Sequence, residues 1–291
     1  MKAALALIQY IFYFDGNCIL HQFHLIVKDG LEMIDAFLAE LSSTCKHPCL
    51  SAGFAKYFAS IAKITHYWRE NASRFVDLWE ATHGVHCGGV KYTLCPLKVV
   101  AGRWGSVDAA ESFLLARGCK LLRPVLLKLL SKTMKVDKSA ARARQGPALA
   151  DDDDEGEAYH IRMTKWASGA FAAVTSTIFW LMLRVANTAR KPLRHFHFWV
   201  QKNTRNRLLF QLVTGKGEEF MIEFKSLVDT FNAWFAAAVV EAGGEVPEEV
   251  LATVRSMAFK LVTHAAGQFH MRIIAPLGRL GWPSFVNYQC G

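Results

Sequence analysis

Hydrophobic residues recur every three or four positions along most of this chain, which is the spacing of amphipathic helices. Charged residues fill the positions between them, most clearly in 53–82, where one long helix is expected. The pattern predicts helices at 25–41, 53–82, 107–117, 120–135, 158–189, 192–213, 217–242 and 247–267. No alternation with a period of two is long enough to predict a strand. We therefore expect a mainly α, multi-helix domain with little or no β-structure.

Residues that favour helix ends support these boundaries. Ser106 is expected to cap the helix at 107–117, because a serine hydroxyl can accept a hydrogen bond from a free N–H of the first turn. Gly243 and Gly244 separate the last two predicted helices, and Pro247 suits the first position of the second one.

The composition changes at 137–157, where helical periodicity stops and an acidic run begins at Asp151. Such a charged stretch is typical of a disordered linker, because it carries too little apolar surface to offset the entropy of ordering. We expect three regions: a helical region at 1–136, the acidic linker at 137–157, and a C-terminal helical region at 158–291.

Bulk composition limits the partners and the compartment. The chain has 291 residues, of which 52% are hydrophobic, and a formal net charge of +9. A basic balance favours polyanionic partners or an anionic membrane surface. The seven cysteines are scattered, unlike the dense and even pattern of a small secreted disulfide scaffold. A reducing compartment, nuclear or cytoplasmic, is therefore expected.

Two apolar segments resemble membrane signals. Residues 1–14 carry one early lysine and then an apolar stretch, but aromatic residues stand where a cleavage site needs small ones. Residues 166–183 hold no charge and are at the short limit for a membrane span. Because 166–183 is rich in Ala, Ser, Thr and Gly, a buried helix is expected there, with a membrane span as the alternative.

Motifs of the best-defined enzyme classes are missing, including the P-loop, the dinucleotide fingerprint, G-x-S-x-G and H-E-x-x-H. Scattered side chains do offer zinc ligands. They are Cys45, Cys49, His83, His86, Cys87 and Cys95. Their spacing does not match a standard finger, and paired C-x2-C knuckles are absent. We expect buried free cysteines, neither a metal nor another cofactor, and no enzymatic activity.

Basic and aromatic residues are interleaved in 190–207. The cations are Arg190, Lys191, Arg194, Lys202, Arg205 and Arg207, and the rings include Phe196, Phe198 and Trp199. Cations for phosphates and flat rings for bases are what a strand-binding surface requires. The alternative is an ordinary amphipathic helix with aromatic side chains in the core and cations in water. The sequence leaves both interpretations open.

Three segments within 14–117 resemble hAT-superfamily transposases, in that family's order. The first is a Cys-x-x-His motif followed by Val-Lys-Asp, the second is a helix that ends in a pattern beginning Tyr-x-Arg, and the third contains Arg-Trp and Leu-Leu. They carry Cys18, His21, Val27, Lys28 and Asp29; Tyr67, Arg69, Ser73, Arg74 and Leu78; and Arg103, Trp104, Glu111, Leu114 and Leu115. No such resemblance extends over 118–291.

The resemblance implies a position where an RNase H-like core gives way to a large helical insertion. It places Arg103 near phosphate and Trp104 against an unpaired base, a stacking contact of about 1–3 kcal/mol. It also implies that Cys18 and His21 anchor a helix beside a core, which makes them packing residues rather than metal ligands.

The catalytic carboxylates of that family are not found. Only Asp15 precedes Cys18, outside the family's aspartate context, and the final residues lack its glutamate block. Because in-line displacement at phosphorus usually needs carboxylates that hold two metal ions, strand cleavage is not expected.

The leading interpretation is thus a catalytically inactive, transposase-derived fragment that binds nucleic acid through Arg103, Trp104 and the basic segment at 190–207. One alternative is a non-enzymatic helical scaffold or interaction protein, or a decayed reading frame. Another is a membrane-associated protein that uses 1–14 and 166–183. DNA or a protein is the expected partner, and membrane insertion is not expected.

Overall fold

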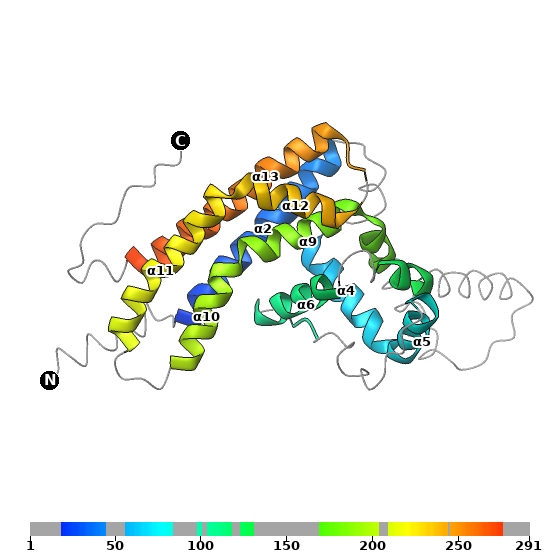
Figure 1. Cartoon of the computed structure of the whole chain (residues 1–291), viewed down its shortest axis with the longest axis horizontal. Coiled ribbons are helices and arrows are strands. Elements are labelled where there is room, and N and C mark those ends of the chain that lie inside the picture. Colours follow the sequence, from blue (N-terminus) through cyan, green and yellow to red (C-terminus); the bar gives the residue numbers. More distant parts are fainter. Residues whose placement is uncertain are drawn as a thin grey trace, which may run out of the picture. The chain divides into compact units, whose positions relative to one another are not determined.

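A computed structural model describes most of the helical part of the chain (Figure 1). The described residues are 19–44, 56–83, 98–100, 104–117, 123–130, 169–203, 209–243 and 245–275. Within these ranges the long segments are all helical and no strand occurs, so the predicted mainly α fold is confirmed. The helices are α2 (Ile19–Thr44), α4 (Tyr57–Glu70), α5 (Ala72–His83), α6 (Trp104–Arg117), α9 (Thr177–Ala189), α10 (Lys191–Asn203), α11 (Leu209–Asp229), α12 (Phe231–Ala242) and α13 (Glu248–Phe269), which continues into the π-helix η1 (His270–Ile274). Residues 123–130 and 169–175 are also helical.

Several predicted helices are interrupted by turns that periodicity does not reveal. The single helix expected at 53–82 is wrong, because α4 and α5 are separated at Asn71. The side-chain Nδ2 of Asn71 donates to the carbonyl oxygen of Tyr67 at 2.9 Å, a bond that competes with helical backbone pairing. In the same way, α11 and α12 break at Thr230, inside the helix predicted at 217–242.

The predicted cap of α6 is also wrong. The helix begins at Trp104, so Ser106 lies within its first turn and not before it. The Ser106 hydroxyl oxygen instead accepts a hydrogen bond from the backbone N–H of Val100 at 2.9 Å. It therefore fastens the preceding connection to the helix.

The chain forms two compact units, each assembled from separated stretches. The first contains Met1–Met33, Thr188–Trp234 and Arg255–Gly291, and the second contains Ile34–Asn187 and Phe235–Val254. The predicted regions 1–136 and 158–291 do not coincide with these units, because each unit draws on both. The predicted linker at 137–157 lies outside the described residues.

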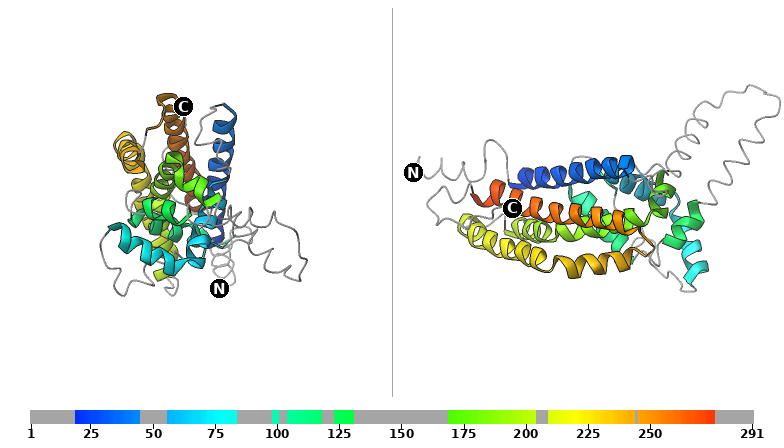
Figure 2. Two further views of the ribbon diagram at one scale, coloured as in Figure 1. Left: turned by 90° about the vertical axis from the view of Figure 1, so that its right-hand side faces the viewer. Right: turned by 90° about the horizontal axis from the view of Figure 1, so that it is seen from above.

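In the first unit, the start of α2, α10, α11 and the second part of α13 lie side by side (Figure 1, Figure 2). They share a cluster of phenylalanine rings: Phe23, Phe196, Phe220, Phe224 and Phe269. The ring centroid of Phe196 lies 5.1 Å from that of Phe23 and 5.1 Å from that of Phe220. A third neighbour, Phe269, meets Phe196 edge-to-face at 5.2 Å. Such pairs stabilise beyond plain apolar burial, and they fix how α10 is rotated.

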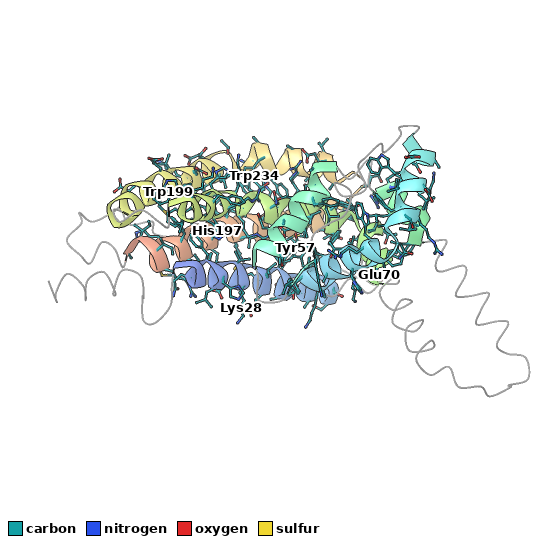
Figure 3. The ribbon with its side chains drawn as sticks, turned by 90° about the horizontal axis from the view of Figure 1, so that it is seen from below. Lys28, Tyr57, Glu70, His197, Trp199 and Trp234 are labelled. Atoms are coloured by element: carbon teal, nitrogen blue, oxygen red, sulfur yellow. The ribbon has the colours of Figure 1, made fainter. Side chains whose placement is uncertain are left out.

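In the second unit, Tyr57 joins α2, α4 and α6 through polar atoms, and Figure 3 shows it where α4 meets α6. Its backbone N–H donates to Asp35 Oδ1 at 2.9 Å, which satisfies a free donor of the first turn of α4. Its hydroxyl donates to Glu111 Oε1 at 2.7 Å. Glu111 is 0% exposed, and a buried carboxyl group without a hydrogen-bond partner is costly, so this hydrogen bond stabilises the unit.

Arg123 connects the ends of two helices in the second unit. Its Nη2 donates to the carbonyl oxygen of Thr175 at 2.5 Å, and its Nη1 donates to that of Gly243 at 3.2 Å. Gly243 follows α12 with a φ of 60°, the left-handed conformation in which helices often end and which glycine adopts without strain. A cation is favourable at both sites because helix C-termini carry unpaired carbonyls and a partial negative charge.

The apolar segment at 166–183 contributes the helix 169–175 and most of α9, which meet at Ser176 at an angle of 82°. The six side chains from Ile178 to Leu183 are no more than 2% exposed, as expected for a buried helix. Across the part of the chain that the structure describes, no single helix is both long and apolar enough to cross a membrane. The bent pair meets these criteria of length and composition only when its two helices are taken together.

Phe196→Ala tests the phenylalanine cluster. Removing a fully buried ring leaves a cavity among its three partners, so we expect the free energy of unfolding to fall by about 3–5 kcal/mol. Phe198→Ala is the matched control, because the same atoms are removed from the same helix at a site that is 53% exposed, and it should change stability by less than about 0.5 kcal/mol. Urea unfolding followed by circular dichroism measures both, and equal losses would contradict the packing described.

Candidate functional site

Helix α10 follows the turn at Arg190 and carries Pro192 in its first turn, where the missing N–H has no helical acceptor. Its apolar stripe, Leu193, Phe196 and Val200, is buried, with no side chain more than 3% exposed. Positions three and four residues apart share a helix face, so burial of this stripe determines which side chains point to water.

The opposite face of α10 combines cations with an exposed ring. Lys191, His195, Phe198 and Lys202 are exposed, and Arg194 is half-buried beside them. Positions seven and eleven residues after Lys191 fall within about 20° of it around the helix axis, so Lys191, Phe198 and Lys202 form one line. The helix contains no Asp or Glu. We call these five residues the α10 face.

The sequence left open whether the rings of this segment face the core or the solvent, and the structure divides them. Phe196 is buried, whereas Phe198 keeps 53% of its surface exposed. Trp199 is half-buried and stacks on Phe196, with ring centroids 6.0 Å apart. The ring centroid of His197 lies 6.1 Å from that of Phe23. Figure 3 labels Trp199 and His197. The core-facing alternative therefore holds for Phe196 and does not hold for Phe198.

Arg190 does not belong to the α10 face. The residue is 6% exposed and its Nε is buried, so it is not among the exposed cations of this helix, and its phosphate contact stays a prediction. The other predicted cations Arg103, Arg205 and Arg207 lie outside the described residues. Trp104 begins α6, and only its backbone is described.

One acidic side chain lies at the edge of the α10 face. Glu223 Oε2 on α11 is 2.9 Å from Nδ1 of His195. Both side chains are well exposed, at 44% for His195 and 38% for Glu223, so water and salt screen the contact. Glu223 lowers the positive potential of the face because it brings a negative charge next to the cations.

Most of the candidate zinc ligands lie outside the described residues, namely Cys45, Cys49, His86, Cys87 and Cys95, and only the backbone is described for His83. Cys18 of the Cys-x-x-His motif also lies outside them, and only the backbone is described for His21. Among the side chains that the structure does describe, no group of three or more His, Cys, Asp or Glu could hold a metal ion. The packing role of Cys18 and His21 stays a prediction.

A second polar cluster in the first unit joins α2 to the end of α13. Arg272 donates from Nη2 to Asp29 Oδ2 at 2.9 Å and from Nε to Gln268 Oε1 at 2.6 Å. His264 lies one turn before Gln268, and among the described residues its buried Nε2 has no hydrogen-bond partner. Burial lowers the pKa of His264, the charge of Asp29 raises it, and that of Arg272 lowers it, with a net decrease. In the sequence, the only sign of this cluster is that His264, Gln268 and Arg272 recur at every fourth position.

Arg272 lies within η1, where the helix takes one more residue per turn than an α-helix. Helix α11 approaches this turn closely at Gly217. A Cβ atom at that position would overlap Cδ1 of Ile274, so a larger residue fits there only if the Ile274 side chain moves. The close approach and the Asp29–Arg272 ion pair together hold the last turn of the helix, and the cluster is best described as a structural latch.

No protein-family model matches the chain, and no curated protein or solved structure matches it either.

The latch predicts a pH dependence of stability. Because the pKa of His264 is lower in the folded protein than its ordinary value of 6.5, the unfolded chain binds the proton more readily. The neutral form of His264 therefore contributes to the free energy of unfolding above pH 6.5, and this contribution is lost as the pH falls below that value. His264→Gln should make stability less sensitive to pH between neutral and mildly acidic conditions. Thermal unfolding of wild type and His264→Gln across that range tests this. The difference between the two proteins at alkaline pH, where His264 is neutral, measures the effect of altered packing and is subtracted. The same pH dependence of stability in both proteins would contradict the prediction.

Proposed function

We propose that this protein is a non-enzymatic nucleic-acid-binding protein and that the α10 face is its contact surface. One observation carries the proposal: Lys191, Phe198 and Lys202 are exposed in one line along α10. The opposite side of the same helix is buried in the core of the unit. Phosphates are the natural ligands for such cations, and a flat ring offers a surface for bases.

The charges of the chain support a polyanionic ligand. The sequence has a net charge of +9, and α10 concentrates Lys191, Arg194 and Lys202 in 13 residues without an acidic side chain. Binding of phosphates to such a surface releases condensed counterions, which supplies most of the affinity at low salt. A contact of this kind does not depend on the base sequence.

The resemblance of 14–117 to hAT-superfamily transposases points in the same direction. If it reflects ancestry, Arg103 and Trp104 would extend the contact surface, and the missing carboxylates would leave binding without strand cleavage. The proposal is therefore of a transposase-derived protein that has kept nucleic-acid binding. The α10 face lies outside the resembling segment, so it supports binding independently of that ancestry.

The double substitution Lys191→Gln and Lys202→Gln tests the proposal. Each lysine that neutralises a phosphate contributes about 0.7 to the salt slope on a single strand and about 0.9 on duplex DNA. The slope of log affinity against log salt should therefore become shallower by about 1.4 to 1.8. Fluorescence anisotropy with labelled oligonucleotides at several salt concentrations measures the slope.

The matched control is Lys28→Gln with Lys260→Gln, which removes two exposed lysines from α2 and α13 of the same unit. It makes the same change in net charge while leaving α10 intact. If the two double variants lose the same affinity and the same slope, binding follows overall charge and the α10 face is not the contact surface.

Glu223→Gln tests the sign of the electrostatic effect. Removing this negative charge leaves the α10 face more positive, so affinity for an oligonucleotide should rise at low salt and the gain should shrink as salt is added. Glu218→Gln serves as a control on the same helix, since that carboxylate forms no hydrogen bond or ion pair with the described residues of α10. If the affinity of Glu223→Gln for the oligonucleotide is unchanged or weaker, the oligonucleotide does not bind at the part of the α10 face that lies next to Glu223.

A further inference from the structure

We infer that the α10 face selects single-stranded or locally unpaired nucleic acid over intact duplex, with Phe198 as the ring on which one base stacks. This inference rests on the proposed function and names the class of nucleic acid that the same surface takes. It concerns one side chain whose exposure the cation pattern alone does not explain.

Phe198 is held in place by the opposite side of its own helix. Phe196, two residues earlier, is fully buried among three other rings, so α10 cannot rotate to bring Phe198 inward without breaking that cluster. The nearest ring on the same helix is His197, with centroids 5.9 Å apart and an angle of 48° between the planes. The exposed ring is therefore presented from a rigid element, which limits the entropy lost when a ligand stacks on it.

The position of the ring matters more than its exposure, because single exposed hydrophobic residues are common on protein surfaces. With a rise of about 1.5 Å per residue, Lys202 lies about 6 Å beyond Phe198 along the helix and Lys191 about 10 Å before it. A strand lying along the helix would bring phosphates to both lysines while a base between them reaches the ring. Cations on both sides of a flat ring are the arrangement found where proteins track a single strand.

Stacking on Phe198 requires a base whose face is free. In a duplex the faces are covered by neighbouring base pairs, so the ring gains nothing from an intact helix. A phenylalanine ring has no hydrogen-bonding group, so it cannot read base edges and every base can stack on it. The ligand class is therefore an unpaired strand without a strong sequence preference.

An acidic protein segment is the competing occupant, because carboxylates would also satisfy the lysines. It would not need a flat ring, and any apolar side chain at position 198 would serve it equally well. The two occupants therefore differ in what they demand of residue 198, and substitutions there separate them.

The experiment uses the full chain and compares wild type with Phe198→Ala, Phe198→Leu and Phe198→Tyr. The probes are a labelled oligothymidylate, a duplex of the same length and polyglutamate as competitor. Wild type should bind the single strand more tightly than the duplex. Phe198→Ala and Phe198→Leu should weaken strand binding about 5- to 100-fold while leaving duplex binding nearly unchanged, and Phe198→Tyr should restore strand binding.

The outcomes separate this inference from the proposed function. If wild type binds neither nucleic acid at low salt, both fail. If it binds duplex as tightly as the strand, or if Phe198→Ala leaves strand affinity unchanged, the proposed function stands and the inference is overturned. Displacement of the strand by polyglutamate at equal charge, with Phe198→Leu as good as wild type, would also overturn it in favour of an acidic protein partner.

Discussion

The burial of Phe196 among Phe23, Phe220 and Phe269 is the contact on which the surface of α10 depends. An α-helix turns by about 100° per residue, so fixing one buried position fixes the direction of all the others. With Phe196 inward, Phe198 and the lysines must point to water. The exposed cations of α10 are therefore a consequence of how the aromatic rings pack on its other side.

Polar atoms set the arrangement of the second unit in a different way. Asp35 caps α4 at Tyr57, and the hydroxyl of the same tyrosine holds the buried carboxylate of Glu111. Apolar packing tolerates small rotations, whereas hydrogen bonds inside a core have narrow geometry and a high cost when broken. One side chain thus fixes the register of three helices.

The sequence predicted the helical class and the cationic, amphipathic character of α10, because both follow from spacing within a short window. It did not predict helix boundaries that depend on particular side-chain hydrogen bonds, some of them from residues far away in the sequence. The break at Asn71 depends on a side chain that turns back on its own helix, and the cap of α4 comes from Asp35, 22 residues earlier. Charge alone does not distinguish Arg190 from Lys191, the next residue. Arg190 lies at the turn before α10 and is buried, whereas Lys191 is exposed.

The candidate site shows the same division between local and distant information. The sequence showed that cations and aromatic rings are interleaved in 190–207, but it could not say which of the rings belong to the core. The contacts of Arg123 and Arg272 could not be predicted from spacing, because each arginine joins segments that are far apart in the sequence.

The π-helical turn η1 has a consequence for how this chain can change in length. A π-turn contains one residue more than the α-turn it replaces, so deleting a residue from 270–274 would restore an ordinary helix. Both kinds of turn complete the same rotation, so this deletion would leave Ile274 on the side of the helix that faces α11. A deletion from the α-helical part of α13 would instead rotate every later residue by about 100° and separate Ile274 from Gly217. The π-turn is therefore the place where this helix can lose one residue and keep its contacts with α11.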